Sequence, residues 1–146
     1  MRKYITTICL LAIFAIANAQ QANKTLVKTL DINSVETLFV DLDGEIVTKT
    51  WDTEGFARVQ IAITYENAST NIMRFLISKG RYNLSLTPDT VGAFMINQPN
   101  YKEDVQIDKE GSLLIEKLIY TFYVPKGVSV VNNREITSKS IVDNKE

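Results

Sequence analysis

The segment from Ala57 to Tyr65 alternates apolar and polar side chains over its whole length. Val59, Ile61, Ile63 and the tyrosine fall on one side, whereas an arginine, a glutamine, an alanine and a threonine fall on the other. A period of two is typical of a β-strand with one buried and one solvent-facing side. A chain organised around such a strand needs a second apolar layer to cover the buried side, which favours a mainly β fold.

Other parts of the chain repeat this pattern between turn-forming residues. The further predicted strands are residues 26–30, 35–40, 45–51, 81–86, 113–124 and 128–131. Thr87 to Thr90 is predicted to be a turn, Lys109 to Gly111 a hairpin-like turn, and residues 91–106 the longest loop. Asp-Gly at 43–44, between two predicted strands, indicates a hairpin, because glycine accepts a positive φ without penalty.

One segment, residues 69–79, breaks the β pattern. Ile72, Phe75 and Leu76 have helical spacing, a serine and a threonine at its start can cap a helix, and Gly80 can end it. The sequence therefore predicts a single domain that is mainly β and mainly antiparallel. Its architecture is expected to be a β-roll, resembling a β-solenoid, or a β-sandwich, with one short helix lying over a sheet.

The N-terminus has the pattern of a secretory signal peptide. Arg2 and Lys3 precede an apolar run from Ile5 to Ala17, and Ala17-Asn18-Ala19 matches an A-x-A cleavage site. Cleavage after Ala19 would leave 127 of the 146 residues, with no apolar stretch long enough to span a membrane. We expect a signal peptide at residues 1–19, a β-domain at 20–133 and a flexible polar tail at 134–146. The protein is expected in the periplasm, at the cell surface or outside the cell.

The amino-acid composition limits which catalytic groups, disulfides and partners the predicted mature chain can have. The sequence has no histidine, and its one cysteine, Cys9, lies inside the predicted signal peptide. Without Arg2 and Lys3, the 16 basic residues become 14 against 17 acidic ones, a net charge of about −3. The absence of a basic stripe disfavours nucleic acid as a partner. We therefore predict no disulfide, no catalytic residues and no cofactor.

The stretch LFVDLDGEI, residues 38–46, resembles the first motif of the haloacid dehalogenase phosphatases, in which one aspartate attacks phosphorus. That motif requires a loop and helices to follow, whereas another alternating segment follows Gly44 directly. Calcium is a second alternative, because Asp41, Asp43 and Glu45 place three carboxylates within five residues. An EF-hand would need wider spacing, so the prediction for these residues is a solvated acidic turn and no metal site.

Aromatic residues cluster in one predicted strand. Tyr120 and Phe122 share a face, and Tyr123 lies on the opposite one. These three could form a binding surface for sugar or a protein partner, but such rows more often pack in a core or across strands.

Three segments together resemble a known family. DLDGEIVTKTWD at 41–52, RVQIAITYE at 58–66 and YVPKGVSVV at 123–131 are similar to the secreted bacterial β-proteins called "putative adhesin" or DUF4097-like. The similarity extends over residues 30–131. It implies a β-solenoid or β-roll and carries over no catalytic residue. Longer members add further β-rungs, so the resemblance implies a minimal domain here.

These observations lead to three functional hypotheses. The first is an exported, non-enzymatic interaction domain of the cell envelope, with an envelope protein or surface glycan as partner. The second is a periplasmic protein that binds a small ligand or carbohydrate through the 91–106 loop and an aromatic face. The third is a hydrolase that uses carboxylates, which a pocket of converging acids would favour.

Overall fold

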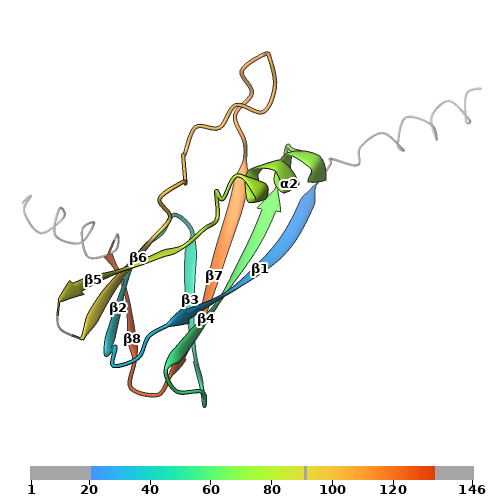
Figure 1. Cartoon of the computed structure of the whole chain (residues 1–146). Helices are drawn as coiled ribbons and strands as arrows, with labels where there is room; N and C mark the ends of the chain where they lie inside the picture. The colour runs from blue at the N-terminus through green and yellow to red at the C-terminus, as the bar shows by residue number, and fades with distance from the viewer. Residues whose placement is uncertain (1–20, 91, 134–146) are drawn as a thin grey trace, which may run out of the picture.

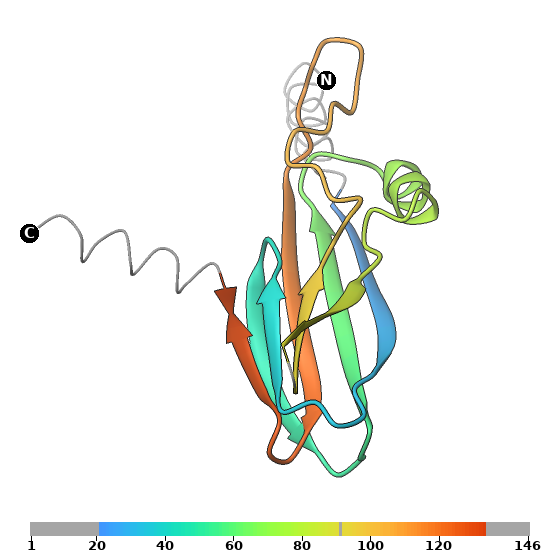
Figure 2. The same ribbon diagram turned by 60° about the vertical axis from the view of Figure 1, so that its left-hand side comes forward.

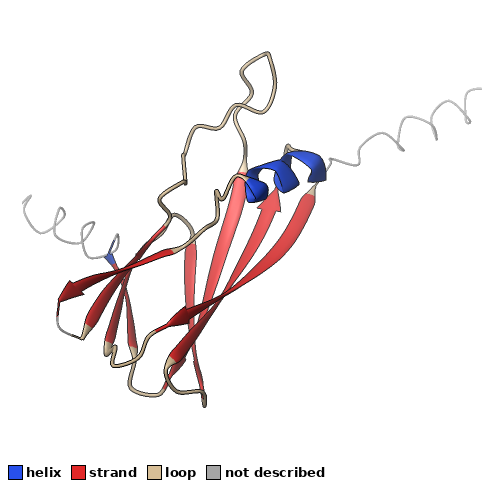
Figure 3. Cartoon of the chain, in the orientation of Figure 1, coloured by secondary structure: helices blue, strands red, loops and turns tan. Residues whose placement is uncertain are grey.

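A computed structural model of the protein describes residues 21–90 and 92–133. The predicted signal peptide and polar tail lie outside these residues. Two four-stranded sheets face each other, and one helix lies beyond one end of the longer strands (Figures 1 and 3). In spatial order, the first sheet contains β1 (Ala22–Asp31), β4 (Phe56–Tyr65), β7 (Glu116–Pro125) and β3 (Glu45–Trp51). The second sheet contains β5 (Ser85–Thr90), β6 (Ala93–Asn97), β2 (Thr37–Asp41) and β8 (Ser129–Asn132).

The prediction of a mainly β single-domain fold with one short helix is confirmed. The alternating segment forms β4, an interior strand of the first sheet, and its apolar side faces the core. Val59, Ile61, Ile63 and Tyr65 are all essentially inaccessible to solvent. Strand β7, next to β4, contributes Tyr120 and other side chains to the same core. The central pair of long strands therefore supplies much of the buried surface.

The sheets are mixed, so the prediction of a mainly antiparallel fold is wrong. Strand β2 runs parallel to both of its neighbours, β6 and β8, and β3 runs parallel to β7. Strands β1, β4 and β7 pair antiparallel, as do β5 and β6. The pattern of side chains reports which face of a strand is buried, but the direction of the neighbouring strand leaves no signature in it.

The turn at residues 42–44 is not a hairpin, because β2 and β3 belong to different sheets. The turn carries the chain from the second sheet to the first (Figure 2). Gly44 has φ +144° and lies so close to β7 that a Cβ atom there would be 2.7 Å from the Leu118 carbonyl oxygen. A strand begins at Glu45, so the helix that a dehalogenase-type motif requires is absent at this point.

Helix α2 (Thr70–Ser78) lies where the sequence predicts it. The Ser69 side chain accepts a hydrogen bond from the Ile72 amide, and Gly80 follows the helix with φ +74°. Ile72 and Leu76 pack against the core as predicted, together with the buried Met73. The prediction for Phe75 is wrong, because its side chain is 58% exposed.

Strand boundaries shift in the segment after the helix. Strand β5 spans Ser85–Thr90, so residues 81–84 of the predicted strand lie outside it and the predicted turn at 87–90 lies within it. The predicted 91–106 loop contains β6. Pro88 is accommodated because β5 is an edge strand with a shift of register after this residue. The long loop therefore spans 98–115. It doubles back at the predicted Lys109–Gly111 turn, where an isolated bridge joins Gln106 to Leu113.

In the described part of the chain, no helix combines the length and apolar character needed to cross a membrane.

Candidate functional site

A cleft of about 630 Å³ opens at one end of the second sheet. It forms where β2 and β6 end, because the two strands run parallel and Asp41 lies in register with Asn97. From there the chain leaves β2 into the turn before β3, and leaves β6 into the long loop. We call this site the acidic cleft. It is lined by Asp41, Leu42, Asp43, Asn97, Gln98, Pro99, Tyr101, Lys102, Glu103 and Asp104.

The lining of the acidic cleft carries more negative than positive charge. Two carboxylates come from the β2–β3 turn, and Glu103 and Asp104 come from the loop opposite. Lys102 is the one basic residue of this lining, so four acidic groups face one basic group. Walls of one dominant sign attract ligands of the opposite sign and repel like-charged ones.

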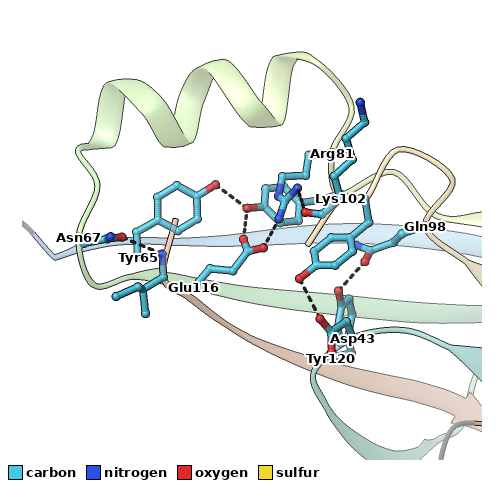
Figure 4. Close-up of polar contacts among 11 residues, drawn as sticks. Asp43, Tyr65, Asn67, Arg81, Gln98, Lys102, Glu116 and Tyr120 are labelled. Atoms are coloured by element: carbon cyan, nitrogen blue, oxygen red, sulfur yellow. Dashed lines mark hydrogen bonds and ion pairs between the residues drawn. The ribbon is translucent and has the colours of Figure 1, made fainter. Parts of the chain in front are cut away.

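A buried ion pair lies beneath the loop that walls the cleft. Arg81 and Glu116 contact each other with side-chain exposures of 4% and 7% (Figure 4). The Arg81 Nη1 atom also donates a hydrogen bond of 2.7 Å to the carbonyl oxygen of Lys102. The guanidinium lies 4.3 Å from the centre of the Tyr101 ring, within the range of a cation–π contact. One arginine therefore holds two consecutive residues of the cleft wall.

Two tyrosines extend this network toward the helix. The Tyr82 hydroxyl donates to Glu116 Oε2 over 2.6 Å, and it also contacts the Tyr65 hydroxyl (Figure 4). A hydroxyl has one proton to donate. Because Tyr82 gives its proton to the carboxylate, Tyr65 must donate to Tyr82. The buried carboxylate of Glu116 thus accepts hydrogen bonds from both a cation and a neutral hydroxyl.

Two further hydrogen bonds connect the walls of the cleft to the sheets. The Tyr101 hydroxyl donates to Asp43 Oδ2 over 3.0 Å, which links the long loop to the β2–β3 turn. The Tyr120 hydroxyl, from the core strand β7, donates to Gln98 Oε1 over 2.8 Å (Figure 4). The cleft is therefore held in shape by contacts among the long loop, the β2–β3 turn and strand β7 of the first sheet.

Electrostatics keep the groups of this network in fixed protonation states. Burial, followed by the hydrogen bond to Glu116, raises the pKa of Tyr82 far above its usual value. Burial is also the main cause of the raised pKa values of Tyr101 and Tyr120. For Arg81, burial alone would lower the pKa, but the hydrogen bond and charge of Glu116 outweigh it and raise the pKa. The three tyrosines therefore stay neutral donors at physiological pH.

Two polar atoms of the cleft residues lack a partner among the described residues. They are Asn97 Oδ1 and Gln98 Nε2, both shielded from solvent. Buried polar atoms usually form hydrogen bonds, and unsatisfied ones often mark a place for water or a ligand. Two adjacent residues of the lining thus present one acceptor and one donor that form no hydrogen bond within the described residues.

The structure separates the acidic residues of the predicted turn. Asp41 and Asp43 line the cleft, whereas Glu45 is exposed at the start of β3 and does not. Within residues 21–90 and 92–133, no three carboxylate, histidine or cysteine groups are placed to hold a metal ion. The calcium alternative for these three residues therefore finds no geometric support.

The predicted aromatic surface does not form as a unit. Tyr120 and Phe122 are fully buried in the core, so the packing alternative describes them correctly. Tyr123 points to the opposite face of β7 and is half-buried.

The Arg81–Glu116–Tyr82 network was not predicted, because its members are 34 and 35 residues apart and come together only in the fold. An arginine followed by a tyrosine directly after a helix-ending glycine was the one local signal.

Comparison with known proteins finds no matching family model and no matching curated protein. A solved structure from Parabacteroides merdae, described as a putative adhesin, matches with a TM-score of 0.31 and 14% sequence identity. The match covers 75% of this chain and 35% of the other protein, so the chain spans about a third of that protein's length. Similarity at this level establishes neither family membership nor function. Membership of the DUF4097-like family thus stays a prediction.

Proposed function

We propose that this protein is an exported, non-enzymatic interaction domain of the cell envelope, and that its acidic cleft binds a positively charged group of a partner protein. The observation that carries this proposal is the charge of the cleft, four carboxylates against one lysine, on walls held in place by buried side chains. A lysine or arginine side chain, or a free amine, has the matching charge and size.

The buried ion pair supports a positioning role for the network. Taking two charges out of water costs free energy that their attraction only partly offsets, so such a pair adds little net stability by itself. Here the arginine also fixes the Lys102 carbonyl and the Tyr101 ring, both in the cleft wall. A wall that is already ordered loses less entropy when a ligand binds, which increases affinity.

Two observations favour binding over catalysis. The chain has no histidine, so neither a Ser–His nor a Cys–His pair of nucleophile and base can be assembled. The tyrosines near the cleft have pKa values raised away from neutral pH, which makes them poor general acids or bases at that pH.

Small-ligand binding is the second candidate function, and the cleft itself favours it. Its volume lies within the range of about 300–1,000 Å³ that is common for ligand pockets. The unpartnered amide atoms of Asn97 and Gln98 could hydrogen-bond a polar ligand, including a neutral one. The experiment below distinguishes these possibilities by the charge of the probe.

The test measures binding of a capped tetralysine peptide and of its tetraglutamine counterpart to the full exported chain by calorimetry. We expect the lysine peptide to bind and to weaken with rising salt, because the attraction is electrostatic. The double variant Glu103→Gln/Asp104→Asn should weaken binding at least fivefold. The matched control, Glu54→Gln/Asp89→Asn, changes the net charge equally at exposed sites outside the cleft and should bind normally.

Three results would contradict the proposal. Equal binding of both peptides would favour a neutral small ligand. Equal weakening by both double variants would mean that overall charge, not the cleft, attracts the peptide. Turnover of glycoside or peptide substrates that depends on Asp43 or Glu103 would instead establish the hydrolase hypothesis.

A further inference from the structure

Three aromatic side chains gather on the outer face of the first sheet, far from the acidic cleft. Trp51 ends β3, Phe56 begins β4 and Tyr123 lies near the end of β7. The Trp51 and Tyr123 ring centres are 6.4 Å apart, with the ring planes at 48°. Phe56 is 43% exposed. We call these three residues the aromatic shelf.

Strand alternation places the shelf outside the core. In β7, Phe122 points inward and is fully buried, so its neighbour Tyr123 points outward. Tyr123 lies in register with Arg58 of β4 on one side and with Lys49 of β3 on the other. Strand β3 starts at Glu45, beside the turn that walls the cleft, and reaches Trp51 six residues later, about 20 Å away. The shelf and the cleft are therefore separate sites.

The orientation of the Trp51 ring is fixed. Its indole Nε1 atom donates a hydrogen bond of 3.2 Å to the carbonyl oxygen of Phe56. Large aromatic rings on a solvent-facing sheet surface are costly to leave exposed, and a ring already held in place is suited to stack against a ligand. A tryptophan that served only to fill the hydrophobic core would point to the inner face of the sheet.

A second feature beside the tryptophan points to a ligand. A hollow of about 240 Å³ is lined by Trp51 and Pro125 together with polar side chains of both charges. The polar lining residues are Asp52, Thr53, Glu54 and Lys126. Lys126 and Asp52 form an exposed ion pair of 3.1 Å. Breaking an exposed pair costs little free energy, so both groups can turn to a ligand. Nearby, the buried Nε atom of Arg58 has no hydrogen-bond partner among the described residues.

The mixture of groups indicates the class of ligand. Aromatic rings bind the apolar C–H face of a ring compound, and the surrounding carboxylates, hydroxyl and ammonium groups bind its polar rim. Two acidic side chains, Asp52 and Glu54, and three basic ones, Lys49, Arg58 and Lys126, surround the shelf. Because neither sign dominates, the site favours a neutral ligand over a strongly charged one.

The Lys49 ammonium lies 5.7 Å from the centre of the Tyr123 ring, and the two ring planes are tilted, so the Trp51 ring is the stacking surface and Tyr123 borders it. We propose that the aromatic shelf binds a neutral carbohydrate through a pyranose ring stacked on Trp51, with Tyr123 at its edge. This site is independent of the function proposed for the acidic cleft.

Trp51 makes the proposal directly measurable, because it is the one tryptophan of the chain. Its fluorescence therefore reports the shelf alone. The full exported chain is titrated with hexasaccharides of β-1,4-glucose, β-1,3-glucose, β-1,4-xylose, β-1,4-mannose and β-1,4-N-acetylglucosamine. We expect a saturable change in Trp51 emission with at least one of them, and retarded migration in gels that contain the matching polysaccharide.

Variants locate the binding. Tyr123→Ala and Trp51→Ala should each weaken retardation in the gel about tenfold or more. The control Phe75→Ala removes a more exposed aromatic ring from helix α2 and should leave binding unchanged. The cleft variant Glu103→Gln/Asp104→Asn should also bind normally, which separates this test from that of the cleft. Thermal unfolding of each variant identifies any loss that is due to misfolding, and Trp51→Leu replaces Trp51→Ala if the latter does not fold.

The proposal is overturned if no sugar of the panel changes the emission of Trp51 or retards the protein. It is also overturned if binding persists in the Tyr123 and Trp51 variants. Capture of a protein that competes for the shelf, with no response to any sugar, would make this face a protein interface instead.

Discussion

Arg81 and Glu116 form a nearly solvent-free ion pair between the segment that follows helix α2 and the first residue of strand β7. Through the same guanidinium, the pair reaches the Lys102 carbonyl and so the wall of the acidic cleft. Three parts of the chain that are distant in sequence are thereby fixed to one point. A structural defect at this point should change both the stability of the fold and the shape of the cleft.

The first prediction concerns removal of one partner of this pair. Glu116→Ala leaves the arginine buried without its counter-charge, and Tyr82 without its acceptor. We expect a loss of about 3–5 kcal/mol in the free energy of unfolding, measured by urea denaturation. The double variant Arg81→Met/Glu116→Leu removes both charges and should lose clearly less than Glu116→Ala alone.

The exposed pair Lys126–Asp52 is the matched control, with side-chain exposures of 81% and 89%. Lys126→Ala should change the free energy of unfolding by no more than about 0.5 kcal/mol. Equal effects at the two pairs would show that burial of the Arg81–Glu116 pair has no energetic consequence.

The second prediction follows from the order of the hydrogen bonds between the tyrosines. Tyr82→Phe removes the donor to Glu116 and the acceptor of Tyr65, whereas Tyr65→Phe removes only the terminal donor. We expect Tyr82→Phe to lower the free energy of unfolding by about 1–3 kcal/mol, and Tyr65→Phe by less. Chemical denaturation of both variants tests this ranking, and a larger loss for Tyr65→Phe would mean that the donor assignment is reversed.

Sequence reasoning succeeded where the signal is local. The alternation in β4, the capping serine and terminal glycine of α2, and the turn at Lys109–Gly111 are each encoded within a few residues. These features depend on side-chain direction and backbone conformation, which the neighbouring residues largely determine. They were sufficient for the fold class and the position of the helix.

What could not be predicted depends on contacts between distant segments. Asp-Gly indicated a tight turn correctly, but whether β3 pairs with β2 or leaves for the other sheet depends on β7, more than 60 residues later. The same holds for the acidic cleft, because Asp41 meets Asn97 only through the parallel pairing of β2 and β6. Tyr120 could be assigned to core or surface only once the second sheet was known to cover it.

The third prediction concerns alkaline pH. Burial raises the pKa of Tyr65, Tyr82, Tyr101 and Tyr120 above the usual value of 10.0. The folded protein therefore holds these four protons more tightly than the unfolded chain does. Their contribution to stability is fully present below pH 10 and is lost as the pH rises above it.

Absorbance at 295 nm, which reports tyrosinate, measures this effect. We expect these four tyrosines, three buried and Tyr101 partly buried, to remain protonated at pH 11 and to ionise only together with the loss of structure seen by circular dichroism. Ionisation of all tyrosines near pH 10 in a chain that stays folded would contradict the burial of these hydroxyls.

The last prediction concerns the turn that carries the chain between the two sheets. At Gly44, φ is +144° and a Cβ atom would lie 2.7 Å from the Leu118 carbonyl oxygen and 3.0 Å from the Tyr120 ring. Gly44→Ala therefore combines backbone strain with a steric clash, and we expect a loss of about 2–4 kcal/mol in the free energy of unfolding. Gly111 also has a positive φ, +89°, but no atom lies within 4 Å of its Cβ position. Gly111→Ala should thus cost about 1 kcal/mol, from strain alone. Urea denaturation of the two variants separates strain from clash, because only the Gly44 variant places a Cβ atom against β7. Equal losses would mean that Gly44 does not approach β7 as closely as described.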